Sequence, residues 1–140
     1  MGRSKIREHI FKLLFMSQFN ETEEMPQQLA LYFDELEELG EEDRSYMEEK
    51  FAQVTAHLEE IDMLLNEISK GWKTSRMARV DLTALRLSVY ELKYEPDIPT
   101  KVSINEAVEL AKKYGGEDSF SFVNGILGKA AKELRQSQNE

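Results

Sequence analysis

The chain has 140 residues, no cysteine and a formal net charge of −9 at pH 7. This length suits a single domain that buries a core without covalent help, and the missing thiols exclude disulfides and Cys-based zinc sites. No apolar run approaches the roughly 18 residues of a membrane span, and the amino end lacks a signal peptide's apolar core. We therefore expect a cytoplasmic protein without a membrane segment.

The acidity belongs to one segment of the chain. Residues 1–20 carry a net charge of +3, residues 21–60 carry −12, and residues 61–140 are balanced. An acidic protein is a poor general nucleic-acid binder, but this distribution leaves both ends able to face a polyanion. We interpret segment 21–60 as a solvated acidic face, favoured over an acidic binding tail.

A first helix is predicted over residues 4–19. Arg7, Phe11 and Phe15 recur at four-residue spacing along one flank, and Arg3 lies one turn earlier. Cations beside aromatic rings suit single-stranded RNA, because the cation meets phosphate and the ring stacks on a base. For Phe11 a core position is favoured, whereas for Phe15 the two interpretations are equally supported.

Two further helical stretches follow. Pro26 is well placed to open the second helix and Gly40 to stop it. From Glu41 to Ile68, apolar residues alternate spacings of four and three, which is a heptad pattern that we attribute to bundle packing. This stretch is either one long helix or two helices broken near Asp62, which can cap.

The next segment predicts an elbow and a central helix. Residues 71–75 are a candidate linker, and Trp72 is expected to pack at the junction. The helix predicted over residues 79–94 is apolar around much of its circumference, which is typical of the centre of a bundle. Pro96 and Pro99 end it and impose an extended connection.

The last two helices carry local signals. Ser103 and Glu106 form a capping-box pattern at the start of one helix, and Gly115-Gly116 predicts a left-handed C-cap at its end. Asp118 or Ser119 can cap the final helix. The polar tail after Arg135 is expected to fray.

Two glycines interrupt the final predicted helix. Gly125 and Gly128 each cost about 1 kcal/mol against alanine in a helix interior. We therefore expect close backbone approach at these positions.

The sequence contains no convincing catalytic constellation. It lacks a phosphate-cradling glycine loop and a nucleophile elbow. His9 lies among basic residues and is expected at the surface or its boundary, far in sequence from His57. We expect no enzyme activity, no cofactor and no metal site.

A binding function has more support, from three groups of residues. The first is the basic first helix with Phe15, and the second is Arg76 with Arg79 at the start of the central helix. The third is the turn and helix start over residues 118–124, where Phe122 lies one residue off the apolar face. Phe122 is therefore either a core aromatic or partly exposed.

Several motifs together resemble the NusB family of transcription antitermination factors. The resemblance covers nearly the whole chain and is strongest over residues 81–127. It rests on Arg7-Glu8, Leu85-Arg86-Leu87, Tyr90-Glu91-Leu92, Val102-x-Ile104-Asn105-Glu106-Ala107-Val108-Glu109-Leu110-Ala111-Lys112, Ser119 and Phe122-Val123-Asn124-Gly125-Ile126-Leu127.

The resemblance implies an all-α fold of about seven helices in two packed helical-bundle subdomains. It divides one RNA-binding domain, residues 1–140, into subdomains of about 1–70 and 71–135, and it favours a helix break near Asp62. The implied function is binding of boxA RNA together with NusE, a small-subunit ribosomal protein. The resulting RNA polymerase antitermination complex promotes read-through, notably in ribosomal RNA operons.

The family's functional positions carry over by motif. The implied partner-binding residues, which lie near the surface that faces NusE and RNA, are Arg76 and Asp81. Relatives often have a denser arginine cluster than the three basic residues before Glu8, which predicts weaker RNA binding by the protein alone. The implied RNA-binding residues are Arg3, Lys5, Arg7, Phe15, Asp118, Ser119, Phe122 and Asn124.

Two alternatives stay open. The same fold serves as the front domain of a ribosomal-RNA cytosine methyltransferase, but we expect no room for a catalytic domain after Leu134. The second alternative is a helical protein-interaction scaffold without RNA binding, which docks through its acidic segment. The sequence decides neither the preferred RNA nor whether the protein is a monomer or a homodimer.

Overall fold

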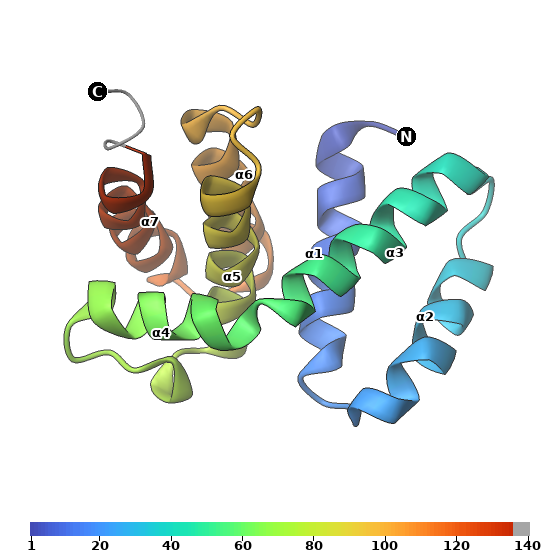
Figure 1. Ribbon diagram of the computed structural model, residues 1–140, viewed down its shortest axis with the longest axis horizontal. Coiled ribbons are helices and arrows are strands. Elements are labelled where there is room, and N and C mark those ends of the chain that lie inside the picture. The colour runs from blue at the N-terminus through green and yellow to red at the C-terminus, as the bar shows by residue number, and fades with distance from the viewer. Residues whose placement is uncertain (136–140) are drawn as a thin grey trace. The chain divides into compact units, whose positions relative to one another are not determined.

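The computed structural model describes residues 1–135, which form seven α-helices and two short 3-10 helices without a β-strand (Figure 1). The predicted all-α class with about seven helices is confirmed. The chain divides into two compact units, Met1–Ala56 and a second from His57 onward. This division lies earlier than the predicted one near residue 70. The polar tail after Arg135, expected to fray, lies outside the described residues.

The first unit contains α1 (Arg3–Ser17), the 3-10 helix η1 (Thr22–Glu24), α2 (Met25–Asp34) and α3 (Glu41–Ala56). Helices α1 and α3 pack together. The second helix is shorter than predicted, because the Leu36 N–H bonds to the Phe33 carbonyl at 3.1 Å in a tighter turn. The buried apolar residues of this unit are Ile10, Phe11, Leu13, Leu14, Met25, Phe33, Met47, Phe51 and Val54.

The acidic segment is a solvent-facing surface. Of the acidic residues between positions 21 and 60, all but Asp43 are exposed, and Asp43 is half-buried. Three of them, Glu41, Glu42 and Asp43, lie in the first turn of α3, where the helix dipole favours negative charge. This exposure agrees with the interpretation of the segment as a solvated face.

His9 is buried, so its predicted surface position is wrong. Its side chain lies against α2, where Nδ1 and the Tyr32 hydroxyl are 2.7 Å apart. Burial lowers the pKa of His9 below its ordinary value, and the positive charges of Lys5 and Lys12 lower it further. Glu8 acts in the opposite direction. The folded protein therefore favours a neutral imidazole here.

The break between the third and fourth helices falls at His57, not near Asp62. His57 has φ −110° and ψ 11°, outside the helical region, and α4 runs over Leu58–Ser69. Its ring lies against that of Tyr94, with centroids 4.4 Å apart. Asp62 cannot cap because its carboxylate accepts two hydrogen bonds from Arg86, at 2.9 and 2.6 Å.

The second unit is built around α5. It contains α4, the 3-10 helix η2 (Thr74–Arg76), α5 (Arg79–Tyr94), α6 (Thr100–Tyr114) and α7 (Ser119–Arg135). Helix α5 contacts α4, α6 and α7, as its apolar circumference predicts (Figure 1). The core of this unit includes Ile61, Leu65, Leu85, Val89, Leu92, Ala107, Ala111, Val123, Leu127 and Ala130.

The predicted capping box is wrong. Helix α6 begins at Thr100 with Pro99 in the N-cap position, so Ser103 already lies within the helix. Its side chain is buried, where the hydroxyl donates to the Glu91 carboxylate at 2.8 Å and lies 2.9 Å from the Ser88 hydroxyl. The Ser103 hydroxyl therefore bonds to α5 and does not cap α6.

Gly115 follows α6 without forming the predicted left-handed C-cap, and the position requires glycine for a steric reason. Its φ of −97° and ψ of −165° are extended. A Cβ there would lie 2.4 Å from the Ser119 Oγ and 2.6 Å from the Ala111 carbonyl oxygen. The expectation at Gly125 and Gly128 is also wrong, because no atom lies within 4 Å of a Cβ built at either position.

Arg135 joins three helices at the end of the second unit. The side chain is buried, and its Nε donates to the Leu92 carbonyl at 3.1 Å. Its Nη2 donates to the carbonyls of Glu91 and Glu95, and its Nη1 donates to the Ile98 carbonyl and the Thr100 hydroxyl. These five bonds match the five donors of a guanidinium, and they fix the end of α7 to the end of α5 and the start of α6.

We expect Arg135→Ala to lower the free energy of unfolding by about 2–4 kcal/mol, because the Leu92 and Ile98 carbonyls would lose their donor, and each carbonyl left buried without a donor costs about 1–3 kcal/mol. Arg135→Lys should lower the free energy of unfolding by a smaller amount than Arg135→Ala, since an ammonium keeps three of the five donors. Urea unfolding of both variants checks this. Equal stability of Arg135→Ala and the unchanged protein would contradict the role given to the guanidinium.

We expect His9 to make stability depend on pH. Below its ordinary pKa of 6.5 the unfolded chain binds a proton at His9 that the folded protein resists, so stability falls as pH drops through this region. Urea unfolding between pH 8 and 5 should show a steeper loss for the unchanged protein than for His9→Gln. Parallel profiles would show that His9 titrates alike in both states.

Candidate nucleic-acid interface

The basic residues at the start of α1 differ in how freely they can meet a ligand. Arg3 is exposed and makes no ion pair within residues 1–135. Lys5 is also exposed, but its Nζ lies 3.3 Å from the Glu8 carboxylate. Arg7 is half-buried. The three predicted contacts therefore lie on one helix, with Arg3 the most accessible cation.

The aromatic residues of the first helix separate into core and surface. Phe11 is buried, as its favoured interpretation predicts. Phe15 is half-buried, and its ring centroid lies 5.1 Å from that of Phe19, a residue with 59% of its surface exposed. The sequence interpretation did not include Phe19, although its four-residue spacing from Phe15 was the available signal. This pair presents aromatic surface close to the carboxyl end of α1.

The turn before α7 is held by its own side chains. Ser119 is buried, its Oγ accepts from the Gly116 N–H at 3.0 Å, and its N–H donates to the Gly116 carbonyl at 3.2 Å. Asp118 is exposed, and its carbonyl accepts from the Phe122 N–H at 3.0 Å. The Asp118 side chain is thus presented on a fixed turn at the amino end of α7.

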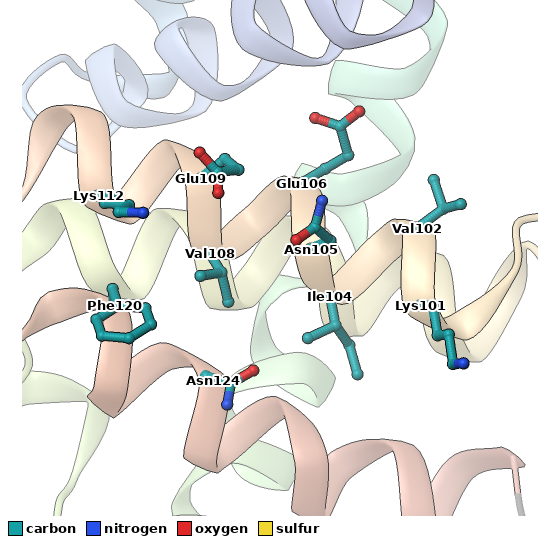
Figure 2. A pocket seen from close by; sticks show the side chains of 10 residues that line it. All are labelled: Lys101, Val102, Ile104, Asn105, Glu106, Val108, Glu109, Lys112, Phe120 and Asn124. Carbon is teal, nitrogen blue, oxygen red and sulfur yellow. The ribbon is translucent and has the colours of Figure 1, made fainter.

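Phe122 and Asn124 lie on different faces of α7, although the sequence groups them. The Phe122 ring is half-buried and meets the ring of Trp72, with centroids 5.9 Å apart. Asn124 instead lines a groove between α6 and α7, together with Phe120 and Ile104 (Figure 2). Two residues along a helix turn about 200°, so one ligand surface does not readily include both side chains.

The groove between α6 and α7 has a mixed lining and a volume of about 740 Å³. Ile104, Val108 and Phe120 supply apolar surface, and Figure 2 shows Ile104 and Val108 of α6 directed toward α7. The Lys112 ammonium lies 5.8 Å from the centroid of the Phe120 ring. Charged side chains complete the lining: Lys101, Glu106, Glu109 and Lys112.

The two residues assigned to a protein partner lie at the beginning of α5. Arg76 is exposed and ends η2, and it makes no ion pair within residues 1–135. Asp81 lies in the first turn of α5 and is buried, and its Oδ1 has no hydrogen-bond partner among the described residues. A buried acceptor without a donor is costly, which makes Asp81 an exception among the polar groups of this helix start.

The sequence interpretation also missed the exposure of Trp72. This side chain was expected to pack at a junction, but 57% of its surface is exposed. A lone tryptophan most often lies in a core, which makes this position difficult to predict. The signal that points to a surface role is the basic sequence around it, Lys70, Lys73 and Arg76.

Residues 1–135 lack both a cluster of metal ligands and a helix that could span a membrane. Residues 1–135 contain no group of three or more His, Cys, Asp or Glu side chains placed to hold a metal ion. Among the same residues, no helix combines the length and the apolar character needed to cross a bilayer.

Comparison with known proteins identifies the family. Residues 4–132 match the model of the NusB family. The chain is 56% identical over 131 residues to the transcription antitermination protein NusB of Agathobacter rectalis, covering 94% of this chain and 100% of that protein. NusB of T. maritima, a solved structure, matches with a TM-score of 0.85 and 34% identity over 99% of this chain and 97% of that one.

A second solved structure contains partners. It is a crystal structure of antitermination factors NusB and NusE in complex with dsRNA, which matches with a TM-score of 0.74 and 25% identity over 94% of this chain and 96% of that one. The matched family consists of antitermination factors and not of enzymes. On its sequence, its fold and these likenesses, the chain belongs to the NusB family.

Proposed function

We propose that this protein binds the boxA element of nascent RNA together with NusE, as part of an RNA polymerase antitermination complex in the cytoplasm. The complex promotes read-through by the polymerase, notably in ribosomal RNA operons. The observation that carries the proposal is membership of the NusB family, together with likeness to a NusB chain solved with NusE and dsRNA. Residues 1–140 act as one RNA-binding domain.

The RNA-binding assignment rests on cations and aromatic rings at two places. On α1, Arg3, Lys5 and Arg7 supply positive charge, and Phe15 with its neighbour Phe19 supplies ring surface. Positive charge meets phosphate and rings stack on unpaired bases, so this pairing suits single-stranded RNA.

The second place is the start of α7. Phe122 offers a ring and Asp118 offers an acceptor for base or sugar hydroxyl donors. Ser119, whose hydroxyl accepts from Gly116, holds the turn that presents both. Asn124 remains a candidate for a separate contact on the groove side of α7.

The NusE contact is assigned to Arg76 and Asp81. Asp81 Oδ1 is buried without a donor, and Arg76 is exposed without an acidic partner in the described chain. A partner that accepts from Arg76 would satisfy this cation, and Asp81 lies close by in the sequence at the start of α5.

The proposal is tested by fluorescence anisotropy of a labelled boxA RNA and a scrambled RNA, with and without NusE, at two salt concentrations. We expect binding that needs NusE, distinguishes boxA from the scrambled RNA and weakens with salt. Negligible RNA affinity even with NusE would instead favour a protein-interaction scaffold.

We expect Arg7→Ala and Phe122→Ala each to weaken boxA binding while leaving the helical circular-dichroism spectrum unchanged. Removal of one stacking ring should weaken binding roughly tenfold or more, and removal of one cation from a phosphate should reduce the salt slope by about 0.7. Tyr46→Ala and Lys129→Ala, which change exposed residues of α3 and α7 outside the assigned site, are the matched controls. Unchanged RNA affinity in both test variants would remove the site assignment.

A further inference from the structure

The connection between α4 and α5 is basic within an acidic protein. Lys70, Lys73, Arg76 and Arg79 lie within ten residues, and no acidic residue occurs between positions 68 and 80. The chain as a whole has a net charge of −9. This segment is therefore a local concentration of positive charge, and Trp72, the chain's single tryptophan, lies in the middle of it.

The connection is an ordered loop. Lys70 and Gly71 reverse the chain with left-handed φ values of 36° and 99°. The Ser69 hydroxyl donates to the carbonyl of Trp72, and the Thr74 N–H donates to the Asn66 side-chain oxygen at 2.8 Å. These bonds attach both sides of the loop to the end of α4, so little conformational entropy remains to be lost when a ligand binds Trp72.

The Trp72 ring packs against another aromatic ring, and much of the side chain is exposed to solvent. Its ring meets that of Phe122 on α7 at an interplanar angle of 75°, an edge-to-face arrangement. The residue nevertheless keeps 57% of its surface exposed. A large apolar ring held at the surface in this way suits contact with a flat ligand.

The cations near Trp72 in the sequence are available to an anion. Lys70, Lys73 and Arg76 are exposed, and none of them pairs with an acidic side chain in the part of the chain that the structure describes. Unpaired cations on the same short loop as an open indole match a chain that carries one negative charge and one flat base per nucleotide.

We propose that Trp72 is a stacking platform for an unpaired base of single-stranded RNA, with Lys70 and Lys73 holding the flanking phosphates. The site rests on the proposed RNA-binding function and extends it, because the Trp72 ring touches Phe122. RNA bound at the start of α7 would then continue along the loop between α4 and α5. Single-stranded RNA fits better than an acidic peptide, since a peptide carries no planar group to match each charge.

The experiment uses the full chain with NusE and an unstructured single-stranded RNA that contains boxA. Because Trp72 is the only tryptophan, and provided that NusE without tryptophan is used, protein emission reports on this side chain alone. Anisotropy of end-labelled RNA measures binding by the whole protein in a separate titration. We expect emission from Trp72 to be quenched at the RNA concentrations that raise the anisotropy.

Variants separate stacking from charge. Trp72→Ala should weaken RNA binding roughly tenfold to a hundredfold, and Trp72→Phe should retain most of the affinity, because a ring still stacks. Changing Lys70 and Lys73 to serine should reduce the salt slope by about 0.7 for each phosphate that no longer meets a cation. Tyr46→Ala removes an exposed aromatic of α3 and should change neither measurement. Thermal unfolding of each variant confirms that it folds.

Three outcomes would overturn the site. RNA binding without quenching, with unchanged affinity for Trp72→Ala, would remove the platform and leave the proposed function intact. A Trp72→Ala variant that loses affinity for NusE alone, but not for RNA, would make the loop a protein contact. No RNA binding by the unchanged protein with NusE would reject the proposed function and the platform together.

Discussion

The packing of the second unit depends on the buried guanidinium of Arg135, which bonds to backbone carbonyls and a hydroxyl instead of a carboxylate. Arg135 gives all five of its N–H donors to four carbonyl oxygens and one hydroxyl. The carbonyls of Glu91 and Leu92 belong to the last turn of α5, where the helix dipole is negative. The Glu91 carbonyl also accepts from the Glu95 N–H at 2.9 Å, whereas Leu92 is followed four residues later by Pro96, which has no N–H to donate. The guanidinium thus satisfies the carboxyl end of the central helix and fixes where α6 and α7 must lie beside it.

The same unit shows how far local sequence signals reach. Apolar periodicity predicted its helices and the central place of α5, because burying an apolar face is what holds a helix in a bundle. Periodicity could not predict that Ser103 lies within α6 and does not cap it. The Ser103 hydroxyl bonds to Glu91, which lies on another helix. Asp62 is likewise a residue type that caps helices, but in the structure its carboxylate accepts hydrogen bonds from Arg86. The capping predictions failed at both positions because the polar side chain bonds to a residue of another helix.

The exposure and the pairing of the candidate interface residues were only partly predictable from the sequence. Phe122 and Asn124 are neighbours in a motif, yet the helical turn between them directs one side chain to Trp72 and the other to the groove with α6. Lys5 counted as a free cation in the sequence, but Glu8 lies one turn away and pairs with it. Trp72 was missed because composition alone favours a buried tryptophan. Exposure and pairing are properties of the packed unit, which sequence spacing does not contain.

The exposed acidic residues of α2, α3 and the connection between them have a consequence for selectivity. Like charges repel a polyanion at distances up to about a Debye length, roughly 8 Å at physiological ionic strength. Bulk cellular RNA is therefore discouraged from settling on this surface, and a small number of basic and aromatic contacts must act together before any RNA is retained. Under the proposed function, this charge distribution gives up indiscriminate affinity in exchange for dependence on a specific RNA sequence and a partner.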